Sequence, residues 1–213
     1  MRIFVLVLSF VFLAGCKSGV ETADNAKKVA KDDGQPNGES PDKGGDPASK
    51  LLDQMAEIEK EAQALKPIDP VPFQKLLPFL PAAPKGYTGE EPQGTTIDLG
   101  EFKHSQAERS YRKGDHHLSI TIQDTAHIPE LYRGFATTRL HVKKIDSTTG
   151  HARTFANGND IGLENYTKAN QAGELVILVG KRFLITVRGD GIQPEFLHTI
   201  YKTIDRQKLL ELK

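Results

Sequence analysis

The chain has very little cysteine: Cys16 is the only one among its 213 residues. Secreted domains that depend on disulfides carry paired cysteines, so this chain forms no internal disulfide. Because no thiol follows Cys16, the rest of the chain cannot form a cysteine protease, a thiol redox enzyme or a zinc site with cysteine ligands. The lone cysteine, which lies close to the N-terminus, therefore needs another explanation.

The chain also lacks an excess of charge of either sign, with 28 basic and 28 acidic residues. Binding to nucleic acid needs a clustered basic excess, so we expect no nucleic-acid partner. The glycine-rich patterns of dinucleotide and phosphate loops are absent too, and we expect no cofactor. The composition therefore indicates no ligand class, and the remaining signals in the sequence concern the targeting and architecture of the chain.

The N-terminal apolar run, Ile3 to Leu13, is shorter than the roughly 20 residues that a membrane-spanning helix needs. Arg2 precedes this run, and the small residues Ala14 and Gly15 follow it. Positive charge, apolar core and small residues in this order are typical of a secretory signal peptide. We therefore interpret residues 1–15 as a signal peptide.

The sequence "LAGC" at Leu13 to Cys16 resembles the lipobox of bacterial lipoproteins. This resemblance implies that Cys16 carries a diacylglycerol (palmitate-type) anchor and becomes the mature N-terminus. Lys17, rather than the aspartate that marks inner-membrane retention, implies the outer membrane and the periplasm in a cell with two membranes. Two or three acyl chains hold a protein stably to a membrane. The alternative is an ordinary signal peptide that ends near a cysteine.

Residues 16–48 are expected to form a lipidated cysteine and a disordered linker, because Lys17 to Ala48 contains no aromatic residue, leucine or isoleucine. Three lysines in the linker, Lys27, Lys28 and Lys31, could contact anionic lipid or simply be solvated. An amphipathic helix is expected over residues 49–66, with Asp46 as N-cap and an apolar stripe. It could dock on the domain, pair with a second copy as a coiled coil, or remain free.

Residues 67–213 are expected to form one globular α+β domain with an internal repeat. "ITIQDTAHIPEL" from Ile120 resembles "ITVRGDGIQPEF" from Ile185. Each unit is predicted to be a hairpin followed by a helix that begins at Pro129 or Pro194. With earlier strands near 95–100 and 160–168, we predict two β-β-β-α halves sharing an antiparallel sheet, with helices on one face. The polar segment 146–159 is predicted to be a loop, with a short strand near 152–155.

The two hairpins have predicted registers. A two-residue turn at Gly114 and Asp115 pairs Tyr111 with Leu118 and Ala107 with Ile122. A two-residue turn at Gly180 and Lys181 pairs Val179 with Arg182 and Ile177 with Leu184. The apolar runs around this second turn are typical of strands that are covered on both faces.

Two pairs of side chains are weak candidates for chemistry. His116 and His117 follow an aspartate, a pattern of certain metal phosphoesterases, but adjacent strand residues point to opposite faces and make poor joint ligands. Asp124 and His127 could act as an oriented general base, although no nucleophile elbow accompanies them. The simpler interpretations are polar surface for the histidines, and a helix cap for Asp124 or Thr125.

Two functions follow from these observations. The first is a membrane-anchored envelope lipoprotein with a non-enzymatic binding or scaffold domain, whose partner would be a protein, peptidoglycan or a small ligand. The second is an envelope hydrolase using Asp124 and His127. Three strand arginines (Arg109, Arg182 and Arg188) could form a patch for an anionic ligand or line a solvated face.

Overall fold

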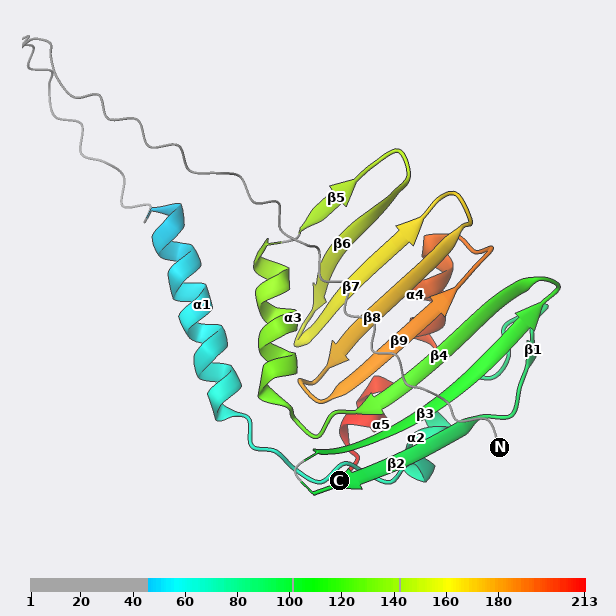
Figure 1. The fold of residues 1–213 in the computed structure, drawn as a ribbon, viewed down its shortest axis with the longest axis horizontal. Helices are drawn as coiled ribbons and strands as arrows, with labels where there is room; N and C mark the ends of the chain where they lie inside the picture. Colours follow the sequence, from blue (N-terminus) through cyan, green and yellow to red (C-terminus); the bar gives the residue numbers. More distant parts are fainter. Residues whose placement is uncertain (1–45, 101, 142) are drawn as a thin grey trace, which may run out of the picture. The chain divides into compact units, whose positions relative to one another are not determined.

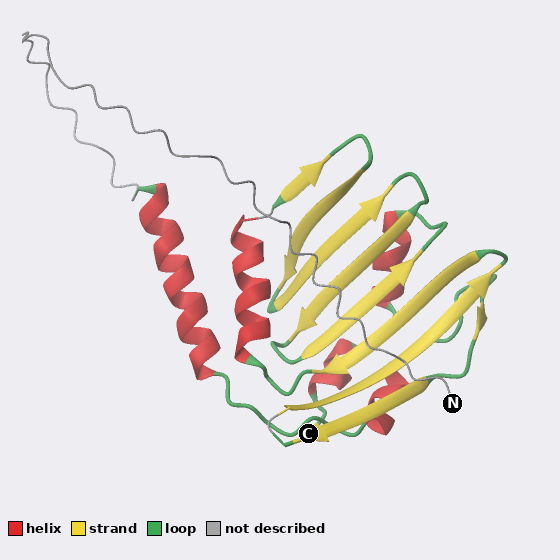
Figure 2. Ribbon diagram, viewed as in Figure 1, coloured by secondary structure: helices red, strands yellow, loops and turns green. Residues whose placement is uncertain are grey.

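The structure is a computed structural model that describes residues 46–213 except 101 and 142. Cys16, the predicted signal peptide and most of the predicted linker lie outside the described residues. The described part contains a nine-stranded sheet in which every pairing is antiparallel, together with helices (Figure 1; Figure 2). The predicted α+β class with an antiparallel sheet is therefore confirmed.

The strands run in the order β1-β3-β4-β9-β8-β7-β6-β5, and β2 pairs with β3 beside β1. Their bounds are β1 Thr88–Gly89, β2 Gln93–Leu99, β3 Phe102–Lys113, β4 His116–Asp124, β5 Lys144–Asp146, β6 Gly150–Asn157, β7 Asp160–Thr167, β8 Ala172–Val179 and β9 Phe183–Gly189. The helices are α1 Pro47–Ala64, α2 Phe73–Leu76, the 3-10 turn η1 Leu77–Phe79, α3 Pro129–His141, α4 Pro194–Lys202 and α5 Arg206–Leu210.

The predicted pair of β-β-β-α halves is present as β2-β3-β4-α3 and β7-β8-β9-α4. The halves meet where β4 pairs with β9 at the centre of the sheet. There Thr121 lies opposite Thr186, and these two threonines are equivalent positions of the sequence repeat. The strands β1, β5 and β6 are additions to this plan.

Helices cover both faces of the sheet, whereas we expected them on one face. Ile177 packs in a core beneath α4, α5 and the α2–η1 segment, while its neighbour Leu178 packs in a second core beneath α3 and α1. Successive strand residues point to opposite faces, so a strand that is apolar at both positions needs cover on both sides. The one-sided prediction was wrong because β8 and β9 have two apolar faces.

The register of the first hairpin is confirmed: Tyr111 pairs with Leu118, and Ala107 with Ile122. The register of the second hairpin was wrong by one residue. Val179 pairs with Phe183 and Ile177 with Ile185, so the turn contains three residues. This register puts Ile177 and Ile185 on one face, whereas pairing Ile177 with Leu184 would have mixed the two cores. In the observed register Arg182 lies in the turn and is not paired in the β8–β9 ladder.

The helix α1 begins at Pro47 and docks through its C-terminal half, one of the three arrangements considered above. Ile58 and Ala62 are buried against α3. Glu59 forms an ion pair with Arg133 at 2.7 Å along the same contact. The exposed Leu52 and Met55 belong to the N-terminal half of the helix.

The segment predicted to be a polar loop contains a full strand. β6 spans Gly150–Asn157 and pairs with β7 over its whole length, and the short strand expected near 152–155 is its middle. The loop prediction was wrong because β6 is rich in polar residues. Side chains such as His151 and Arg153 form polar contacts, which leave no alternating apolar pattern in the sequence. Gly150 is needed at the start, where a Cβ would lie 2.0 Å from the Tyr166 carbonyl oxygen.

Candidate functional site

Asp124, the last residue of β4, is a fully buried carboxylate. Arg182 donates to both of its oxygens, from Nε at 3.0 Å and from Nη2 at 2.6 Å. The backbone N–H groups of Val71 and Ala126 donate to the same carboxylate at 2.8 and 3.0 Å. Its acceptor positions are thus occupied by a guanidinium and two backbone groups, which gives it a structural role that includes capping the turn before α3.

His127 lies in the same turn, in the left-handed backbone region with φ of 60°. Partial burial and the nearby positive charge of Arg182 lower the pKa of His127, against the opposing effects of Asp124 and the Lys66 backbone. The chain turn thus brings the two candidate residues to one place. The described hydrogen bonds of the Asp124 carboxylate, however, come from groups other than the imidazole.

His116 and His117 take separate positions at the start of β4. The His116 ring lies against Gly191, where an added Cβ would be 1.6 Å from its Nδ1 atom. The backbone N–H of His117 donates to the Asp190 carboxylate at 2.9 Å. Within residues 46–213, apart from 101 and 142, no group of three or more histidine, cysteine, aspartate or glutamate side chains is placed to hold a metal ion.

The three strand arginines do not form a common patch. Arg109 donates to the carbonyl oxygens of Glu90 and Pro81, and Arg188 pairs with Glu174 across the β8–β9 ladder. Arg182 is buried against Asp124. Each guanidinium therefore has a local partner.

A second buried carboxylate, Glu164 on β7, was missed from the sequence. Its side chain has no exposed surface, and His151 Nε2 lies 2.5 Å from its Oε1 atom. Arg153 donates to the same oxygen from Nε at 2.7 Å, and His198 of α4 bonds to Oε2. We call these four residues the Glu164 cluster. It ties β6 and β7 to α4.

Electrostatics favour the ionised form of Glu164. Burial raises the pKa of this carboxyl, but hydrogen bonds from His151, Arg153 and His198 outweigh burial and hold it below its ordinary value of 4.5. The alternation of His151, Arg153 and Phe155 along "HARTF" was the available sequence signal, because it places these three side chains on one face of β6.

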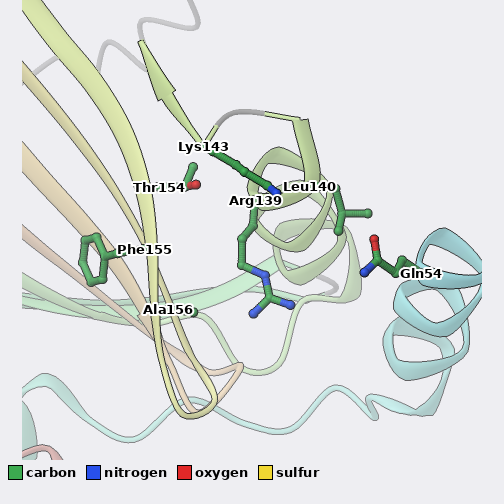
Figure 3. A pocket seen from close by; sticks show the side chains of 7 residues that line it. All are labelled: Gln54, Arg139, Leu140, Lys143, Thr154, Phe155 and Ala156. Atoms are coloured by element: carbon green, nitrogen blue, oxygen red, sulfur yellow. The ribbon is translucent and has the colours of Figure 1, made fainter. Parts of the chain in front are cut away.

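A groove of about 490 Å³ opens on the opposite face of the sheet, among α1, α3 and β6 (Figure 3). We call it the cationic groove, and its lining residues are Gln54, Arg139, Leu140, Lys143, Thr154, Phe155 and Ala156. In Figure 3 the side chains of Arg139, Lys143 and Gln54 lie on the helical side of the groove, while the Phe155 ring points away from it. Its size falls within the range of about 300–1,000 Å³ that is usual for ligand sites.

The two cations of this groove are exposed, and neither forms an ion pair in the part of the chain that the structure describes. The charge of Arg139 is still close enough to Glu61 to help to lower the pKa of that carboxyl. Both cations lie at the C-terminal end of α3 and just after it, where the helix dipole favours positive charge. A groove with two such cations, one amide and one leucine suits a ligand that combines negative charge with apolar surface. No sequence pattern indicated it, because three separate segments build it.

Comparison of the chain with protein-family models, with curated proteins and with solved structures found no match. Among the described residues, none of the helices is both long enough and apolar enough to cross a bilayer.

Proposed function

We propose that this chain is a lipid-anchored protein of the bacterial envelope whose folded domain is a non-enzymatic binding module for an anionic ligand. Its anchor would be Cys16, and the outer membrane is its expected place in a cell with two membranes. The cationic groove is the observation that carries the binding part of the proposal. Among protein, peptidoglycan and small-ligand partners, those that present carboxylates fit it best.

Arg139 and Lys143, the two cations of the groove, are the physical reason to expect an anionic ligand. Other cations of the described chain are held by carboxylates, as Arg133 is by Glu59 and Arg182 by Asp124. Arg139 and Lys143 are instead exposed and line a concave surface beside Leu140. A bound carboxylate would receive charge-assisted hydrogen bonds there, which are stronger than neutral ones.

The test is binding of peptidoglycan fragments and of their acidic peptides to the mature lipidated protein in detergent micelles. We expect the double variant Arg139→Gln, Lys143→Gln to bind about tenfold more weakly or worse, since two ionic contacts of exposed side chains are lost and each is worth up to about 1 kcal/mol. Lys85→Gln, Lys202→Gln is the matched control, because it removes two exposed cations far from the groove lining. Equal losses in both double variants would indicate general charge attraction and would count against this site.

The anchor has a separate test. Mass spectrometry of the mature N-terminus is expected to show an acylated Cys16, and Cys16→Ser is expected to abolish acylation and release the protein from membranes. A Cys16→Ser protein that is still acylated and membrane-bound would disprove Cys16 as the site of the lipid anchor without affecting the groove.

The hydrolase alternative at Asp124 and His127 stays a prediction. The saturated carboxylate of Asp124 favours the binding module over it. Activity that is lost in His127→Ala, with the fold intact, would reverse this preference.

A further inference from the structure

We propose that the occupant of the cationic groove is an extended acidic peptide segment, which adds a short strand to the open edge of β6. This inference rests on the proposed function and deepens it, because it names the chemistry of the ligand and the way it binds. Three observations carry it: the open strand edge, the cations beside it, and the wall formed by α1 and α3.

The outer edge of β6 is only partly covered. β5 pairs with His151 to Arg153 and stops there. The next residue, Thr154, donates its N–H to the Lys143 carbonyl oxygen at 3.3 Å. Beyond it, Ala156 and Asn157 are exposed. The sheet edge is thus open over the last residues of β6, of which Ala156 lines the groove.

The ladder alternation determines which backbone groups face the groove. In an antiparallel pair, alternate residues bond to the partner strand and the residues between them point their N–H and C=O groups the other way. Because the Thr154 N–H points outward to Lys143, the N–H and C=O of Ala156, two residues on, also point outward. They form a donor and acceptor pair of the kind that an extended backbone satisfies.

The side chains around this edge select for negative charge. Arg139 and Lys143 flank the edge, and in Figure 3 both side chains lie on the helical side of the groove. Native proteins protect open edges with charge or cover, and here both charges are positive. A second copy of the same edge would bring four cations together, whereas acidic side chains or a terminal carboxylate would be complementary.

The remaining wall suits a peptide better than a free anion. Leu140 offers apolar surface, and the Gln54 amide can both donate and accept. The side chain of Ala156 is a single methyl group, the smallest of any residue that has a Cβ, so it leaves the strand edge sterically open. An inorganic anion would use the cations alone and leave the strand edge unpaired.

The experiment measures fluorescence anisotropy of a labelled hexapeptide of alternating valine and glutamate, titrated with the full mature protein in micelles. Two further peptides are compared: one with lysine in place of glutamate, and one N-methylated at every central peptide bond. We expect the acidic peptide to bind, and each of the other two to bind about tenfold more weakly or worse. Absence of binding by the acidic peptide overturns the proposal.

Two protein variants separate this inference from the proposed function. Ala156→Pro removes the outward N–H, and Arg139→Gln, Lys143→Gln removes the charges. Loss of binding in both variants, with unchanged circular dichroism, supports strand addition. If the charge variant loses binding while the N-methylated peptide and Ala156→Pro bind normally, strand addition is wrong but an anion-binding groove stands. A protein dimer that Ala156→Pro dissociates would instead assign the edge to a second copy, and would also overturn the proposal.

Discussion

Two fully buried carboxylates, Asp124 in the first half of the domain and Glu164 in the second, are held in different ways. Both side chains have no exposed surface. Asp124 is bonded to a guanidinium that is itself buried and to two backbone N–H groups. Glu164 is bonded to two imidazoles and a guanidinium, all of them partly exposed. One centre is closed to water, and the other lies just beneath the surface.

This difference indicates what each centre does for the fold. Arg182 also donates to the Leu212 carbonyl oxygen at 2.8 Å, so the Asp124 centre joins β4, the β8–β9 turn and the C-terminal end. The partners of Glu164 come from β6 and α4, and they can exchange their contacts for water. Burial raises the pKa of the Glu164 carboxyl, but the hydrogen bonds from its partners outweigh burial and lower it, so the contribution of this carboxylate to stability depends on pH. We therefore expect the first centre to be costly to break and the second to respond to pH.

The largest effect is expected for Asp124→Ala. Removing this carboxylate leaves the buried guanidinium of Arg182 without a counter-charge, which typically costs about 3–5 kcal/mol of unfolding free energy. Urea denaturation followed by circular dichroism measures it. Asp53→Ala, which removes an exposed carboxylate of α1, is the control and should stay within about 0.5 kcal/mol of the parent chain.

The pair can also be removed as a whole. Asp124→Leu combined with Arg182→Met takes away both charges, and it should be less destabilising than Asp124→Ala, because no unpaired ion remains. A double variant that is as unstable as the single one would show that the bonds to Val71 and Ala126, rather than the charge pair, are the important contacts.

A smaller effect is expected for Glu164→Gln. The amide keeps the shape of the side chain but loses the charge and one acceptor, so the loss of unfolding free energy should be about 1–3 kcal/mol. It should be smaller than at Asp124, because His151, Arg153 and His198 can each reach water. Glu195→Gln, at an exposed position of α4, is the matched control. A loss at Glu164 larger than that at Asp124 would contradict the comparison.

The sequence predicted the parts of the fold that have a repeating apolar pattern. Tyr111, Leu118 and Ile122 fixed the register of the first hairpin, because a shift of one residue would expose them all. In the second hairpin both alternating sets are apolar, so the pattern could not choose between neighbouring registers. The same two-sided apolarity, visible at Ile177 and Leu178, argued for helices on both faces and against the one-sided prediction.

The candidate site was much less predictable. β6 is polar because His151 and Arg153 bond to a carboxylate on the neighbouring strand, and a single sequence does not indicate that such a partner exists. The cationic groove depends on where β5 stops and where α3 ends. Neither is marked by a motif, and the docking of α1 that brings Gln54 to the groove depends on tertiary packing.

The smallest and most specific effect is expected in the acid range. The folded-state pKa of Glu164 lies below 4.5, so ionised Glu164 contributes stability that is fully present above about pH 4.5 and is lost as the pH falls through the lowered folded-state value. The difference in unfolding free energy between the parent chain and Glu164→Gln should therefore be largest above that pH and shrink below it. Denaturation series at several pH values measure this difference, and the control Glu195→Gln should show no such change. A difference that grows on acidification would mean that burial, rather than the bonds from His151, Arg153 and His198, dominates the ionisation of Glu164, and the contrast between the two carboxylates would fail.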